Sequence, residues 1–175
     1  LGSIYAMKQI QSKNGEKGCN RYIISNCGSL ENLLQLFALH KICDWEKPTV
    51  DIIPLFETVS DLEASYEVMN KLYSNTEYIN HLKRRKMKQT VMLGFSDGTK
   101  DGGYFMANWS IYKAKESLSS ISSKYGIKIA FFDGRGGPPA RGGGNTHQFY
   151  ASLGESIQSD DIQLTIQGQT ISSNF

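Results

Sequence analysis

Short apolar segments alternate along this chain with longer segments of helical periodicity, and this alternation constrains the fold more than any other feature. The apolar segments span four to seven residues each, at 22–25, 50–56, 90–95, 127–132 and 163–166. Parallel neighbouring strands need a long crossover connection between them, and a helix usually supplies it. The pattern therefore predicts an α/β fold in which parallel strands alternate with helices.

Three helical segments carry their own start or stop signals. The clearest has apolar residues every three or four positions over 107–125 and is followed by Gly126, a typical helix end. Ser29 is placed to cap an earlier helix, and Ser60 with Glu63 has the spacing of a capping box ahead of another. These helices fall between the predicted strands, as βαβ units require.

The length of the chain limits how much of such a fold it contains. A complete (β/α)₈ barrel takes about 250 residues, whereas this chain has 175. Four to five strands suffice for an open sheet or for about half of a TIM-type barrel, in one unit over residues 1–175. The chain opens at Leu1 without a methionine, so we expect a piece of a larger protein.

Composition excludes several classes of protein. Hydrophobic residues make up 39% of the chain and charged residues 21%, which is typical of a globular protein. A formal net charge of +2 gives no bulk attraction to nucleic acid or membranes, and no apolar run is long enough to span a bilayer. The three cysteines lack disulfide or zinc spacing, so we expect a cytoplasmic protein.

Two carboxylates follow neighbouring predicted strands. Glu57 comes directly after the second strand and Asp97 shortly after the third. In parallel α/β folds ligands bind at the carboxyl ends of the strands, so both side chains are expected at the binding edge. Oxygen ligands without nearby His or Cys suit Mg²⁺ or Mn²⁺ better than zinc. The alternative is that both residues only cap the helices that follow.

Lys100 lies in a glycine-containing turn that we expect just before the long helix. There its charge and the free N–H groups of the helix would converge on an anion. The alternative is an ordinary solvated surface lysine.

The fourth predicted strand leads into a segment that is rich in glycine and arginine. Residues 134–144 contain six glycines and two arginines, Arg135 and Arg141. Ordering so many glycines costs conformational entropy, which favours a ligand-binding role over a simple connector. Arginine forks and backbone amides suit carboxylate or phosphate oxygens, although the spacing matches neither a Walker A loop nor a dinucleotide motif.

Two further features have simpler explanations. The basic run over 81–88, which begins at His81, is expected to be a solvated helix face stabilised by the helix dipole rather than a nucleic-acid patch. His147 follows the glycine-rich segment, and we expect a structural histidine in the first turn of the next helix.

These motifs together resemble phosphoenolpyruvate carboxylase in their order and approximate spacing. They are Leu55-Phe-Glu-Thr58, Val91-Met-Leu-Gly-Phe-Ser-Asp-Gly-Thr-Lys-Asp-Gly-Gly103, Phe132-Asp-Gly-Arg-Gly-Gly137, Arg141-Gly-Gly-Gly144 and Leu164-Thr-Ile-Gln-Gly-Gln169. The resemblance extends over nearly the whole chain. It implies a central segment of a large barrel enzyme that holds about half of the strands.

The resemblance also implies a reaction and a set of roles. The family adds bicarbonate to phosphoenolpyruvate, giving oxaloacetate and phosphate, and uses Mg²⁺ or Mn²⁺. By resemblance, Glu57 and Asp97 are metal ligands and Lys100 is catalytic. Arg135 and Arg141 are catalytic and bind substrate together with the backbone at 136–137, that is, Gly136 and Gly137. The parent is expected to be a homo-oligomer that binds neither nucleic acid nor membranes.

The sequence departs from the family pattern at several points. Asp133 stands where the family usually has histidine, which changes the charge at that corner of the site. The family's catalytic histidine and further phosphate-binding arginines lie upstream and downstream, so the segment alone is expected to be inactive. Two alternatives remain: another metal-dependent enolate or phosphoryl-transfer barrel enzyme, and an RGG-type RNA-binding module built on Arg135 and Arg141.

Overall fold

A computed structural model describes residues 1–134, 146–158 and 161–165 of the chain. It contains the five strands that the apolar segments predict, each shifted by at most two residues at either end. They are β1 (Arg21–Ile24), β2 (Asp51–Phe56), β3 (Lys88–Leu93), β4 (Lys128–Asp133) and β5 (Ile162–Leu164). The prediction of an α/β fold is confirmed.

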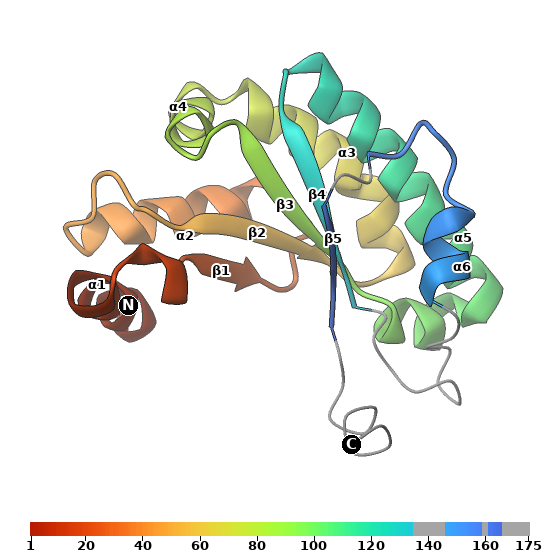
Figure 1. Ribbon diagram of the computed structural model, residues 1–175, viewed down its shortest axis with the longest axis horizontal. Helices are drawn as coiled ribbons and strands as arrows, with labels where there is room; N and C mark the ends of the chain where they lie inside the picture. The colour runs from red at the N-terminus through yellow and green to blue at the C-terminus, as the bar shows by residue number, and fades with distance from the viewer. Residues whose placement is uncertain (135–145, 159–160, 166–175) are drawn as a thin grey trace.

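The strands form one open, parallel sheet in the order β1-β2-β3-β4-β5 (Figure 1). Successive parallel strands that lie side by side, with no reversal of order, are wound as in a (β/α) barrel. A doubly wound sheet would instead reverse its order at a switch point. The winding therefore favours part of a barrel over the other arrangement that the sequence allowed.

Helices connect the strands. They are α1 (Gly2–Asn14), the short 3₁₀ helix η1 (Glu16–Gly18), α2 (Leu30–Ile42), α3 (Val59–Ser74), α4 (Thr76–Arg84), α5 (Ser96–Lys124) and α6 (Thr146–Ala151). Helices α3 and α5 pack against each other along the sheet (Figure 1). Helix α1 lies beside the β1 edge, where the Ser3 and Tyr22 hydroxyls are 3.0 Å apart.

One face of the sheet forms the core with the helices. Alternate strand residues pack into a single apolar cluster with α2, α3, α4 and α5; they are Ile52, Phe56, Val91, Leu93, Ile129 and Phe131. On the opposite face, Leu55, Met92 and Phe132 stand in one row across β2, β3 and β4 and are only half-buried. This one-sided cover is what part of a barrel presents, because the inner face of a barrel packs against its other strands.

The predicted capping box at Ser60 and Glu63 is wrong by two residues. The Thr58 hydroxyl accepts a hydrogen bond from the backbone of Asp61 (3.1 Å), and the Asp61 carboxylate accepts one from the backbone of Thr58 (3.1 Å). Thr58-x-x-Asp61 and Ser60-x-x-Glu63 have the same spacing. The former lies where β2 ends, so it caps the helix.

Helix α5 begins earlier than its apolar repeat predicts. Its first segment covers Ser96–Gly102 and includes Lys100, which we expected in a turn. Gly103 then interrupts the helix with φ +80°, a conformation that favours glycine, and the long apolar segment follows. The predicted end at Gly126 is confirmed, because the helix stops at Lys124 and Gly126 has φ +66°.

His81 contradicts the prediction of a solvated basic face. Its side chain is 1% exposed and lies against the rings of Phe37 on α2 and Tyr78 on α4. Arg85 is also mostly covered and forms ion pairs with Asp51 and Glu16. The end of α4 is therefore folded against the start of β2, and only part of the run faces solvent.

Candidate active site

The carboxyl ends of β2, β3 and β4 lie directly beside one another. The backbone N–H of Gly94 donates to the carbonyl of Phe56 (2.8 Å), and that of Gly134 donates to the carbonyl of Leu93 (2.9 Å). These two bonds continue the ladder one residue beyond each strand. Glu57, Gly94 and Gly134 therefore follow adjacent strand ends along a single edge, which we call the carboxyl edge.

Two glycines bring the start of α5 against Glu57. A Cβ atom on Gly94 would lie 3.1 Å from the Cα of Glu57, and one on Gly98 would lie 3.3 Å from its carbonyl oxygen. Both distances are shorter than side chains normally allow, so the close approach depends on glycine. Asp97 precedes Gly98, and the structure thus brings the segment that carries Asp97 next to Glu57.

The alternative that Glu57 and Asp97 act only as helix caps is wrong for Glu57. Helix α3 is capped by Thr58 and Asp61. Glu57 contributes only a backbone N–H, 3.4 Å from the Asp61 carboxylate. Asp97 lies within the first turn of α5, where a negative charge is favoured by the helix dipole, and the N-cap itself is Phe95.

Lys100 is a solvent-exposed lysine that is paired with Asp97. Its Nζ atom donates to Oδ1 of Asp97 at 2.8 Å, and the two side chains are 77% and 51% exposed. The hydrogen bond to Asp97 raises the pKa of Lys100, which therefore stays cationic at neutral pH. The first turns of α5, which approach Glu57 at Gly98, thus carry a cationic and an anionic group.

The donor set at this edge suits a hard divalent cation. No cluster of three or more His, Cys, Asp or Glu side chains that could hold a metal occurs within residues 1–134, 146–158 and 161–165. Mg²⁺, however, usually keeps several waters and takes one or two carboxylates together with substrate oxygens. Glu57 and Asp97 offer two carboxylates of this kind, and the described residues offer no closed, all-protein metal cage.

Several predicted site residues fall outside the described part of the chain: Arg135, Gly136, Gly137 and Arg141. Gly134, which precedes them, lies where the predicted segment leaves β4. A Cβ atom there would be 3.1 Å from the carbonyl oxygen of Leu93, so a side chain has little room. His147 lies in the first turn of α6, as predicted, but its side chain is exposed, which does not indicate the structural role that we expected.

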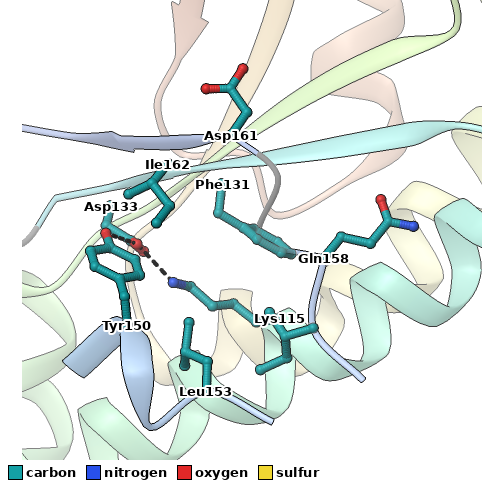
Figure 2. A pocket seen from close by; sticks show the side chains of 9 residues that line it. Lys115, Phe131, Asp133, Tyr150, Leu153, Gln158, Asp161 and Ile162 are labelled. Carbon is teal, nitrogen blue, oxygen red and sulfur yellow. Dashed lines mark hydrogen bonds and ion pairs between the residues drawn. The ribbon is translucent and has the colours of Figure 1, made fainter. Parts of the chain in front are cut away.

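A buried ion pair at the end of β4 was not predicted. Lys115 on α5 donates to Oδ2 of Asp133 at 2.7 Å, and the two side chains are only 1% and 4% exposed (Figure 2). The Tyr150 hydroxyl, from α6, donates to the same oxygen at 2.5 Å. We call Lys115, Asp133 and Tyr150 the β4 cluster.

The sequence held one signal for this cluster. Lys115 follows Ile111 by four positions and precedes Leu118 by three, so it falls on the apolar stripe of α5. A charged residue on such a stripe requires a buried partner, because an unpaired buried charge is very costly. Asp133 is the first acidic residue after that helix.

The fold and the carboxyl edge define a class of protein: an α/β protein with barrel-type winding and acidic and basic side chains at its ligand-binding edge. Comparison with known proteins makes this specific. The family model described as phosphoenolpyruvate carboxylase matches residues 1–175. A phosphoenolpyruvate carboxylase of Nitrosomonas europaea is 38% identical over 173 residues, which cover 95% of this chain.

The chain belongs to the phosphoenolpyruvate carboxylase family. It spans 18% of the length of the Nitrosomonas relative and corresponds to a fragment of that protein. Within the described residues, no helix is both long and apolar enough to cross a membrane.

Proposed function

We propose that the chain is part of an enzyme that joins bicarbonate to phosphoenolpyruvate and releases oxaloacetate and phosphate. The observation that supports this most strongly is the close approach of Gly94 and Gly98 to Glu57, in a chain whose full length matches this family. It gathers the candidate metal ligands and Lys100 at the edge where parallel α/β folds bind ligands.

Glu57 and Asp97 are the proposed ligands of Mg²⁺ or Mn²⁺. A divalent cation bound there would supply Lewis-acid stabilisation of the negative charge on the substrate. Glu57 has no capping function, so its carboxylate is available. Asp97 would exchange its contact with Lys100 for the cation, which costs little because exposed ion pairs contribute little to stability.

Cationic side chains are proposed to hold the anionic reactants. Lys100, once released from Asp97, would position bicarbonate or CO₂ together with Arg141. Arg135 would hold the phosphoryl group with its planar fork of donors, and the backbone N–H groups of Gly136 and Gly137 would add to it. For Arg135 and Arg141 the support is the family motif, since both lie outside the described residues.

The setting of this reaction is also part of the proposal. The 175-residue segment alone should not convert phosphoenolpyruvate. It spans only 18% of the length of its relative, and the family's other catalytic groups lie outside this segment. We place the parent protein in the cytoplasm as a homo-oligomer. The support for the location is that Cys19, Cys27 and Cys43 are all free thiols.

Incorporation of labelled bicarbonate into oxaloacetate tests the proposal in the complete parent protein of which these 175 residues are a part. We call that protein the full-length chain. With Mg²⁺ or Mn²⁺ present, we expect phosphoenolpyruvate-dependent incorporation. Glu57→Gln and Asp97→Asn should each lower kcat at least about a hundredfold, as is typical when a group that stabilises transition-state charge is lost.

Glu116→Gln is the matched control for these variants. Glu116 is a carboxylate on the same helix as Asp97 and pairs with the surface residue Lys113, so its loss should leave kcat unchanged. Phosphoenolpyruvate turnover without label incorporation would indicate a different enolate or phosphoryl-transfer enzyme. Full activity in both Glu57→Gln and Asp97→Asn would contradict the assigned metal ligands.

A further inference from the structure

The β4 cluster holds two opposite charges in surroundings that water hardly reaches. Around the Nζ atom of Lys115, the ring centroids of Phe131, Phe149 and Tyr150 lie at 5.3 to 5.4 Å. Figure 2 shows the lysine side chain running past Leu153 toward Asp133. The cavity beside it measures about 10 Å³, which is room for about one water molecule.

This burial makes the two charges depend on each other. An exposed lysine can exchange its partner for water at little cost, whereas Lys115 and Asp133 would each be left uncompensated if the other were removed. The second carboxylate oxygen of Asp133 makes no hydrogen bond within the part of the chain that the structure describes. Within the described residues, Lys115 is therefore the cation that offsets the charge of Asp133.

The position of Asp133 connects the cluster with the candidate active site. It is the last residue of β4, and Gly134, which follows it, is hydrogen-bonded to Leu93 at the carboxyl edge. The carbonyl of Asp133 also accepts a hydrogen bond from Thr165 beyond β5 (3.0 Å). A fixed negative charge thus stands at the edge where the proposed reaction requires two anions to bind.

We propose that Lys115 is a positioning residue for the anion site, which acts by neutralising Asp133. The Asp133 carboxylate places a negative charge at the end of β4, beside the carboxyl edge where the proposed reaction binds anions. Lys115 cancels that charge from the helix side and keeps it from opposing phosphoenolpyruvate and bicarbonate. This inference rests on the proposed function, because it concerns the binding of those substrates.

If Lys115 compensates the charge of Asp133, the two single variants should change the KM in opposite directions. A purely structural role predicts no such difference. Lys115→Met leaves an uncompensated carboxylate and should raise the KM for phosphoenolpyruvate about tenfold. A tenfold change corresponds to about 1.4 kcal/mol, which lies within the range of one uncompensated charge at an effective dielectric constant of about 20. Asp133→Asn leaves a positive charge, so its KM should stay at or fall below that of the wild type.

The experiment measures kcat and KM for phosphoenolpyruvate, and the inhibition constant of inorganic phosphate, in the full-length chain and both single variants. The double variant Lys115→Met/Asp133→Asn should return both constants to near the wild-type values, with kcat changed less than KM. Raising the ionic strength should reduce the difference between the single variants, since salt screens the charge. If Lys115→Met is not recovered folded, Lys115→Gln removes the same charge and keeps a hydrogen-bond donor.

Equal increases of KM in both single variants would overturn the inference, as would an unchanged KM in Lys115→Met. Direct binding of inorganic phosphate, measured by calorimetry, separates this failure from failure of the proposed function. If the protein forms no oxaloacetate, but Lys115→Met still binds phosphate more weakly than the wild type and Asp133→Asn does not, only the proposed function is refuted. A wild-type chain that binds neither phosphate nor phosphoenolpyruvate would refute both.

Discussion

Two lysine–aspartate pairs near the carboxyl ends of the strands have almost the same geometry in opposite surroundings. Lys100 and Asp97 are 2.8 Å apart with side chains 77% and 51% exposed, and Lys115 and Asp133 are 2.7 Å apart with side chains 1% and 4% exposed. Distance alone would rate the two pairs as equal. Burial decides what each can do, because it sets the cost of separating the charges.

The exposed pair can exchange its partners for water or a ligand, whereas the buried pair keeps its partners permanently. Water can replace either partner of Lys100–Asp97, so both groups are free to take up a cation or an anion. Neither Lys115 nor Asp133 can leave its partner without an uncompensated charge in an apolar setting. Burial therefore leaves the first pair able to exchange partners, as the proposed ligand binding requires, and fixes the second pair in place.

The largest expected effect is loss of stability when the buried pair is broken. Lys115→Met should lower the free energy of unfolding by about 3–5 kcal/mol, because Asp133 then carries an uncompensated buried charge. Urea denaturation of the full-length chain measures this change. The double variant Lys115→Met/Asp133→Asn should recover most of the loss, and equal destabilisation in the single and double variants would contradict a mutual dependence.

His81 is a third buried titratable group, and within the described residues it forms no ion pair. It shows what burial does to a group that lacks a charged partner. Burial lowers the pKa of His81 from 6.5 to about 4, and the nearby Arg84 and Arg85 add to this while Asp51 opposes it. The unfolded chain therefore binds a proton between pH 6.5 and 4 that the folded chain does not. Stability is fully present above pH 6.5 and falls with pH, by up to about 3 kcal/mol in total.

Denaturant unfolding at several pH values measures this loss in the wild type and in His81→Leu. The variant should show a smaller loss between pH 6.5 and 4. Part of the slope should remain, because burial also lowers the pKa of His40. An identical pH dependence in the two proteins would show that His81 does not supply the effect.

The smallest expected effect belongs to the exposed pair. Lys100→Met should leave the urea midpoint unchanged, since its side chain is 77% exposed and an exposed ion pair contributes little to stability. The same variant should lose carboxylation activity if Lys100 positions bicarbonate. A clear loss of stability would mean that the exposed pair is structural after all.

The sequence predicted the strands well and the helix starts less well, for physical reasons that particular residues illustrate. Apolar runs such as 127–132 identify strands because most of their residues are buried in the fold. Thr58 and Ser60 both satisfy a capping pattern, and only the end of β2 decides between them. The order of the strands, which distinguishes barrel winding from a doubly wound sheet, depends on pairings between distant segments.

The candidate site was predictable where it follows strand ends and unpredictable where it depends on tertiary partners. The placement of Glu57 and of the segment that carries Asp97 at the carboxyl edge was predictable because parallel strands bring their carboxyl ends together. The burial of His81 depends on Phe37 from a different helix, which no local charge pattern reveals. Lys115 was overlooked because its partner Asp133 lies on another element, although its place on an apolar stripe was visible.

The central claim is that Asp97 exchanges its contact with Lys100 for a metal ion that Glu57 also binds. Binding of Mn²⁺ to the full-length chain tests this claim most directly. Electron paramagnetic resonance of free Mn²⁺ measures the bound fraction in the wild type, in Glu57→Gln, in Asp97→Asn and in the control Glu116→Gln. We predict that the wild type and the control bind Mn²⁺ equally and that each of the other two variants binds it at least about tenfold more weakly. Equal binding by all four proteins would contradict the assignment of Glu57 and Asp97 as metal ligands.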